Sequence, residues 1–219
     1  ARGYADYYPE QPGGIATGRA IEGERYDIRR LGPWRKKVRG LIPMAAHTYE
    51  VAKINLAFRS VSGFLTAANV VGIQTILPLL IGKQKVGLGN SLMGQLLEVA
   101  LARKIPVLLE TPLVELIVED GTVVGVVAKR KGEKVRIRAR RGIMLAAGGF
   151  AHNDAMRQEH HPHPITTGWT SANPGDQGTV ITAGVDAGAA VALMDDAWWG
   201  PSVVMPSGSP QLLLAERSL

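Results

Sequence analysis

Residues 142–149 read Gly-Ile-Met-Leu-Ala-Ala-Gly-Gly, an apolar run that ends in four small residues. An uninterrupted apolar run is typical of a parallel strand buried on both faces, so we expect a strand over Gly142–Leu145. The small residues that follow let another backbone or a ligand approach closely. In doubly wound sheets, ligands bind at the carboxyl ends of the strands. Taken alone, the stretch is equally compatible with a tight turn packed against a helix.

The residues before this run predict a helix and then an antiparallel insert. Ser91 is a candidate N-cap for a helix that ends near Arg103. Two β-rich runs flank the sequence Glu-Asp-Gly at 119–121, which is a favourable hairpin turn. The expected strands are Ile105–Leu109, Leu113–Val118, Val123–Ala128 and Lys134–Arg138. The fold class is therefore α/β, mixed with antiparallel (α+β) elements.

The flanking regions differ in character. We expect helices over residues 43–81, a loop-rich stretch over 152–173, a helix over 179–188 and a short strand over 191–194. The apolar stretch from Val61 to Ile81 contains several polar residues and Pro78. Because a spanning helix needs about 20 mostly apolar residues, we interpret it as a buried or substrate-lining helix pair broken at Pro78, with no stable membrane span.

Composition excludes several classes of function. The chain has a formal charge of +6 and no cysteine, which excludes disulfides, thiolate metal sites and a cysteine nucleophile. Arg136, Arg138 and Arg140 alternate with apolar residues, and no aromatics are interleaved with them, so we expect a solvated strand face and no nucleic-acid partner. No signal-peptide pattern opens the sequence, and we expect a cytoplasmic protein.

Three histidines and one aspartate are further candidates. His160, His161 and His163 lie beside Pro162 and Pro164 without a second ligand cluster, so we expect a polar loop and no metal site. Asp176, in the sequence Asn-Pro-Gly-Asp-Gln-Gly at 173–178, precedes a predicted helix. It is either the cap of that helix or a carboxylate aimed at a ligand, and without further context the cap is favoured. No glycine-rich pyrophosphate loop occurs in the sequence.

The order of these elements resembles the fumarate reductase and 3-ketosteroid dehydrogenase superfamily of FAD proteins. The resemblance is closest to the 3-ketosteroid Δ1-dehydrogenases (3-oxosteroid 1-dehydrogenases). The matching stretches include Gly-Tyr-Ala-Asp-Tyr-Tyr at 3–8, Ala-Ala-Gly-Gly-Phe-Ala-His-Asn at 146–153, Asp-Asp-Ala-Trp-Trp at 195–199 and Glu-Arg-Ser-Leu at 216–219. Together they cover most of the chain, and their joint order is more specific than any one of them.

The resemblance implies FAD as cofactor and a role for five residues. Leu113 would contact the adenine region through its backbone, Ala147 and Gly148 would flank the cofactor, and Asp176 would contact FAD. Tyr4 would match a tyrosine of the steroid site. The family's glycine-rich motif would lie before residue 1, and its principal catalytic tyrosine after residue 219.

Two departures from the family pattern matter. The family turn is usually Thr-Gly-Asp-Gly, whereas Gln177 is inserted here, which leaves the geometry of Asp176 open. Fumarate reductases have a substrate-binding histidine before a proline in the tryptophan region. Gly200 precedes Pro201 here, which argues against a dicarboxylate substrate.

The expected organisation is part of a Rossmann-like FAD domain at 82–150 between two parts of a substrate (cap) domain, 1–81 and 151–219. The expected activity is 1,2-dehydrogenation of a 3-ketosteroid or a similar apolar ketone by the whole enzyme, of which this chain is an internal piece. Two alternatives remain open. One is a related FAD-dependent dehydrogenase or reductase acting on another enone, and the other is a non-catalytic folded piece without cofactor.

Overall fold

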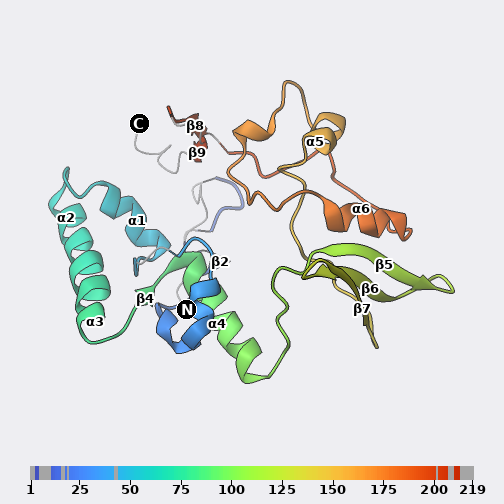
Figure 1. Ribbon diagram of the computed structural model, residues 1–219. Coiled ribbons are helices and arrows are strands. Elements are labelled where there is room, and N and C mark those ends of the chain that lie inside the picture. The colour runs from blue at the N-terminus through green and yellow to red at the C-terminus, as the bar shows by residue number, and fades with distance from the viewer. Residues whose placement is uncertain are drawn as a thin grey trace. The chain divides into compact units, whose positions relative to one another are not determined.

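The computed structural model describes residues 3–4, 11–15, 18, 20–41, 44–200, 202–206 and 210–212. The chain divides into two compact units, Ala1–Val107 and Leu108–Leu219. Both combine helices with small antiparallel sheets (Figure 1). The mixed α+β class expected from the sequence is therefore confirmed.

Unit 1 is mainly helical. Its elements are β1 (Gly3–Tyr4), β2 (Ala20–Ile21), β3 (Tyr26–Asp27), η1 (Ile28–Lys37), α1 (Thr48–Asn55), α2 (Val61–Ala68), η2 (Asn69–Ile76), α3 (Leu77–Leu80), β4 (Lys85–Val86) and α4 (Leu88–Ala102). β3 pairs with β4 in antiparallel register, and the core beside this pair consists of Tyr26, Ile28, Leu31 and Val86.

Helix α4 packs on this core through a face that includes a glycine. A Cβ atom added at Gly94 would lie 2.8 Å from the ring atom Cδ1 of Tyr26, so only glycine lets the helix come this close. Leu97 and Leu101 continue the same contact. The prediction that Ser91 caps α4 was wrong, because the helix begins at Leu88 after Gly87. Ser91 is instead buried, and its hydroxyl donates to the Glu24 carbonyl.

The apolar run of unit 1 forms one helical stretch from Val61 to Leu80, with α2, η2 and α3 in succession. The prediction of a break at Pro78 was wrong. A π-type bond from Leu77 N–H to the Gly72 carbonyl, five residues back, widens the turn ahead of Pro78 and accommodates its ring. Among the described residues this helix alone is long and apolar enough to cross a membrane, on length and composition only. Only 17% of its most apolar window is buried.

Unit 2 contains a three-stranded antiparallel sheet in the order β5–β6–β7, formed by β5 (Leu113–Glu119), β6 (Thr122–Arg130) and β7 (Glu133–Arg138). Glu119 pairs with Thr122 across a two-residue turn. Both turn residues, Asp120 and Gly121, have positive φ, as the hairpin turn suited to twisted strands requires. The hairpin and the third strand were predicted correctly, and Arg136 and Arg138 are exposed as expected.

The rest of unit 2 consists of α5 (Asp154–His160), η3 (Thr167–Trp169), α6 (Thr179–Asp186), β8 (Ser202–Val204) and β9 (Pro210–Leu212). Helix α5 was missed because its seven residues lack an apolar period. Asn153 is a residue type that favours the N-cap position, so the sequence did contain a signal for the start of this helix. In the structure its side chain accepts a hydrogen bond from Met156 N–H.

Three expected strands do not form, namely Ile105–Leu109, Gly142–Leu145 and Val191–Met194. Met144 is 89% exposed, so the run that predicted a buried strand is neither paired nor covered by the described residues. A strand exists only through hydrogen bonds to a neighbour, and no parallel neighbour lies within the described part of the chain.

Candidate cofactor site

Two loops of unit 2 that are about two dozen residues apart in sequence are joined by three hydrogen bonds. His152 N–H donates to the Asp176 carbonyl at 2.9 Å, and Gly178 N–H donates to the Gly149 carbonyl at 2.9 Å. The Asn153 side-chain amide donates to the Gln177 carbonyl at 2.9 Å. The loop after the apolar run and the loop before α6 therefore form one platform, which we call the loop pair (residues 146–153 and 173–178).

The loop pair brings two predicted cofactor residues together. Gly148 has φ +85°, and a Cβ atom added there would overlap the Asp176 carboxylate and lie 3.1 Å from its Cγ atom. The carboxylate therefore lies directly against the glycine backbone. Glycine is needed at 148 both for the left-handed backbone and for this contact.

The Asp176 side chain does not cap helix α6, so that alternative was wrong. The N-cap is Gly178, two residues later, and no side chain bonds to the helix there. Gln177, the residue inserted relative to the family turn, separates Asp176 from the cap. Within the described part of the chain the Asp176 carboxylate accepts no hydrogen bond from protein, whereas its backbone N–H donates to the Asn173 carbonyl at 2.8 Å. The carboxylate is therefore held in place by its backbone and remains available to a ligand.

Helix α6 and strand β5 border a cleft of about 430 Å³ within unit 2. Val114, Glu115, Leu116 and Val118 line it from β5, and Gln177, Thr179, Thr182, Ala183, Asp186 and Ala187 line it from the other side. Leu113 is the first residue of β5, and Gln177 follows Asp176. The cleft thus begins next to two of the predicted cofactor residues. β5 is also an edge strand of its sheet, so alternate backbone groups on its outer side have no strand partner in the described part of the chain.

Ala147 lies at a bend of the same loop and is exposed. Four of the five predicted site residues thus belong to unit 2: Leu113, Ala147, Gly148 and Asp176. Tyr4 belongs to unit 1, where its backbone pairs with Ala20 in β1 and β2. The side chain of Tyr4 lies outside the described residues, and its role remains a prediction.

The residues of the loop pair fit a cofactor that carries hydroxyl groups. A carboxylate with unused acceptor sites is a strong partner for sugar or ribityl hydroxyls. A glycine backbone without side chains lets a flat ring system approach closely. No group of three or more metal-ligating residues occurs within the residues that the structure describes.

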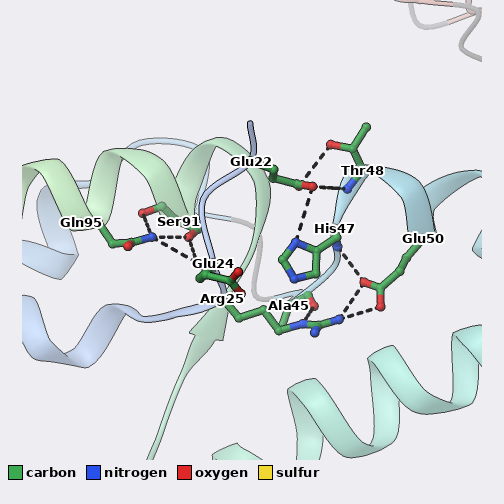
Figure 2. Close-up of polar contacts among 9 residues, drawn as sticks. All are labelled: Glu22, Glu24, Arg25, Ala45, His47, Thr48, Glu50, Ser91 and Gln95. Carbon is green, nitrogen blue, oxygen red and sulfur yellow. Dashed lines mark hydrogen bonds and ion pairs between the residues drawn. The ribbon is translucent and has the colours of Figure 1, made fainter. Parts of the chain in front are cut away.

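A buried polar cluster in unit 1 was not found from the sequence (Figure 2). Glu22 accepts bonds from Thr48 N–H at 2.9 Å and from the Thr48 hydroxyl at 3.1 Å. Glu50 accepts from His47 N–H at 2.7 Å and receives the Arg25 guanidinium on both oxygens, each at 2.7 Å. The His47 Nδ1 atom lies 3.5 Å from Glu22. We call these four residues, Glu22, Arg25, His47 and Glu50, the clasp.

The clasp joins the start of α1 to the chain before β3. Glu22, His47 and Glu50 are at most 8% exposed, and the Arg25 side chain is 19% exposed. The carboxylates satisfy N–H groups that the first turn of a helix leaves without partners. Arg25 Nε also donates to the Ala45 carbonyl at 2.6 Å. These contacts indicate that the clasp has a structural role. The only sequence signal for it is Glu50 in the first turn of α1.

Tyr26 is a residue of the buried core. Burial, and then the nearby Glu98 carboxylate, raise the pKa of Tyr26 to about 12. A phenol with this pKa stays protonated at neutral pH, so it contributes an apolar ring to the core.

The sequence and structure have known relatives. The chain matches the FAD binding domain family over residues 7–219. The 3-oxosteroid 1-dehydrogenase of Mycolicibacterium smegmatis is 40% identical over 226 residues, which cover 99% of this chain and 39% of the relative. The enzyme of the same name from Mycobacterium tuberculosis is 40% identical over 227 residues, which cover 99% of this chain and 40% of the relative.

The crystal structure of 3-ketosteroid delta1-dehydrogenase from Sterolibacterium denitrificans in complex with 1,4-androstadiene-3,17-dione superposes with a TM-score of 0.85. The two sequences are 35% identical, and the match covers 98% of this chain and 41% of that chain. The chain therefore spans about two-fifths of the length of the relatives it matches.

Proposed function

The chain belongs to the FAD binding domain family, and from this premise we propose that its protein is an FAD-dependent dehydrogenase that acts on CH–CH groups of a 3-ketosteroid or a similar apolar ketone. The relatives with this activity match nearly the whole chain. The observation that carries the proposal in this chain is the Asp176 carboxylate, which lies against Gly148 and accepts no hydrogen bond from the described residues. The likeness to steroid dehydrogenases supports the substrate class.

All the proposed contacts with the cofactor lie in unit 2. FAD, when bound, supplies the hydride acceptor. Asp176 accepts a hydrogen bond from a cofactor hydroxyl, Gly148 and Ala147 let the cofactor approach the loop, and the Leu113 backbone contacts the adenine region. We propose that the adenosine part of FAD binds in the cleft between β5 and α6, because the walls of this cleft begin next to Leu113 and Asp176.

Residues 1–81 and 151–219 are proposed to belong to the substrate domain, and 82–150 to the FAD domain. We also propose a cytoplasmic location, with which a chain without cysteines is compatible. Fractionation of cells that produce the natural protein would test the location, and recovery outside the cytoplasm would contradict it.

Replacing Asp176 by alanine in the natural protein is expected to weaken FAD binding by about tenfold or more, because a hydrogen bond to a charged group contributes about 1.5–3 kcal/mol. The free energy of unfolding without FAD should change little, since the side chain does not cap α6. FAD titration followed by flavin fluorescence, together with denaturant unfolding of the apoprotein, measures the two quantities separately.

Asp154→Ala is the matched control. Asp154 is an exposed aspartate in the first turn of α5, so its loss should leave FAD affinity unchanged. Equal FAD affinity in wild type and Asp176→Ala would remove Asp176 from the cofactor site. A wild-type natural protein that binds no FAD would overturn the proposed function as a whole.

Tyr4→Phe in the natural protein is expected to reduce turnover by at least about tenfold, less than the roughly 10²–10⁴-fold effect of an acid–base group itself, because Tyr4 only assists the base. Dehydrogenation beside a ketone requires a base that removes a proton. A tyrosine base with its ordinary pKa near 10 is mostly protonated at neutral pH, and a second phenol that donates a hydrogen bond stabilises its phenolate. We propose Tyr4 as this second phenol.

Steady-state turnover and bound flavin are the measurements for Tyr4→Phe, and Tyr49→Phe is the control. Tyr49 is 40% exposed and stacks on His47, so its hydroxyl should not affect turnover. Unchanged turnover in Tyr4→Phe, on a substrate that the wild type accepts, would exclude Tyr4 from the reaction.

A further inference from the structure

An aromatic cluster around the buried ring of His161 contacts the loop pair in unit 2. The Phe150 ring follows Gly149 directly, and its centroid is 5.0 Å from that of His161 and 5.8 Å from that of His160. The His161 ring meets Trp199 edge-on at 5.3 Å. His161 is only 8% exposed. A displacement of His161 would therefore move the residue next to the glycines of the proposed cofactor loop.

Arg157 supports the same loop from the same side. It is 4% exposed, and its guanidinium donates to the Ala151 carbonyl at 3.0 Å. The backbone N–H of His161 donates in turn to the Arg157 carbonyl at 2.9 Å. Two side chains of one short segment thus contact consecutive loop residues, Phe150 through its ring and Ala151 through its carbonyl.

Several polar atoms of this pair are buried without a hydrogen-bond partner among the described residues: Arg157 Nε, His161 Nδ1 and His161 Nε2. The charged and titratable groups around His161 are Arg157 and His160 on its own segment and Asp195 and Asp196 on the segment before Trp199. Burial, and then the charges of Arg157 and His160, lower the pKa of His161 below its ordinary 6.5, while Asp195 and Asp196 oppose the shift. His161 is therefore neutral at neutral pH.

We propose that Arg157 and His161 are positioning residues, which hold Ala151 and Phe150 where Gly148 meets Asp176 and so set the affinity for FAD. The inference rests on the proposed function and adds two residues that are not among the proposed cofactor contacts. Arg157 acts through a hydrogen bond and His161 through ring packing. A second positive charge on His161 would be buried beside Arg157 without a hydrogen-bond acceptor among the described residues, so protonation favours a displaced ring and a displaced loop.

The sign of the pH effect follows from this arrangement. A histidine whose pKa is lowered in the ordered site takes up a proton when the site opens, at any pH between its lowered value and 6.5. The ordered site is fully favoured above that window and becomes less favoured as the pH falls through it. Acid should therefore weaken FAD binding, and base should not.

The test is the dissociation constant of FAD for the natural protein at about pH 7.5 and about pH 5.5. The lower pH is about one unit below the ordinary histidine pKa of 6.5, so the titration of one histidine can raise this constant by at most about tenfold. We expect an increase in wild type, of at most about tenfold. His161→Phe keeps an aromatic ring that cannot titrate. In this variant the dissociation constant should therefore rise less between about pH 7.5 and about pH 5.5 than it does in wild type. His163→Phe is the matched control, because His163 is exposed in the same segment and its loss should leave the wild-type increase intact.

Each outcome decides the proposal. An acid effect lost in His161→Phe and kept in His163→Phe supports it. An equal acid effect in wild type and His161→Phe overturns the positioning role and leaves the proposed function standing. A wild type that binds no FAD at pH 7.5 overturns both. If His161→Phe does not fold, His161→Gln takes its place, because glutamine does not titrate.

Discussion

Gly148→Ala in the natural protein is expected to weaken FAD binding by at least about a hundredfold, which corresponds to about 2.7 kcal/mol. Two effects add at this position. The φ of +85° costs a residue with a side chain about 1–2 kcal/mol, and the new methyl group would occupy the space of the Asp176 carboxylate. Either the carboxylate or the loop must move, and both changes take Asp176 away from the cofactor.

Gly149→Ala is the control in the adjacent residue. Gly149 does not have a positive φ, and a Cβ atom added there meets nothing within 4 Å. FAD titration and thermal unfolding of both variants separate loss of the site from loss of the fold. Wild-type FAD affinity in Gly148→Ala would contradict the proposed site. Loss of affinity in Gly149→Ala with an intact fold would show that the cofactor also approaches this glycine.

Glu50→Ala is expected to lower the free energy of unfolding by about 3–5 kcal/mol, since removing one partner of a buried ion pair leaves the other charge without compensation. Arg25 would lose both of its 2.7 Å bonds to the carboxylate. The N–H of His47 would also lose its acceptor at the start of α1. Denaturant unfolding measures the change. Under conditions in which the variant is fully folded, its FAD affinity should stay close to wild type.

The surface pair in unit 2 provides the comparison. Glu119 and Arg138 form an ion pair at 3.2 Å, but their side chains are 48% and 72% exposed. Glu119→Ala should cost no more than about 1 kcal/mol, because water solvates both charges. Equal costs for Glu50→Ala and Glu119→Ala would mean that the clasp does not stabilise unit 1.

Local sequence patterns predicted the antiparallel part of unit 2. Two β-rich runs around Asp120-Gly121 specify two strands and the turn between them within one short segment. All of these interactions are local, so no distant residue is needed to decide them. The same holds for the helical character of residues 48–80 and for α6, which the structure places at Thr179–Asp186.

Patterns failed where the outcome depends on a distant partner. The apolar run Gly142–Leu145 has the composition of a buried strand, yet no neighbouring strand pairs with it in the described part of the chain. Ser91 has the chemistry of a cap, but its hydroxyl bonds to Glu24, 67 residues away, inside a helix that begins three residues earlier. Nothing near Ser91 in the sequence carries that information.

The fold class, the hairpin, the family resemblance and the residues proposed to contact FAD all follow from sequence patterns. Tertiary structure alone decided that Gly148 and Asp176 touch, that Asp176 is not a cap, and that Glu22, Arg25, His47 and Glu50 join. The physical reason is the range of the interactions. Turns and periodicity depend on neighbours in the chain, whereas a carboxylate's partner is whichever group the fold brings within about 3 Å of it.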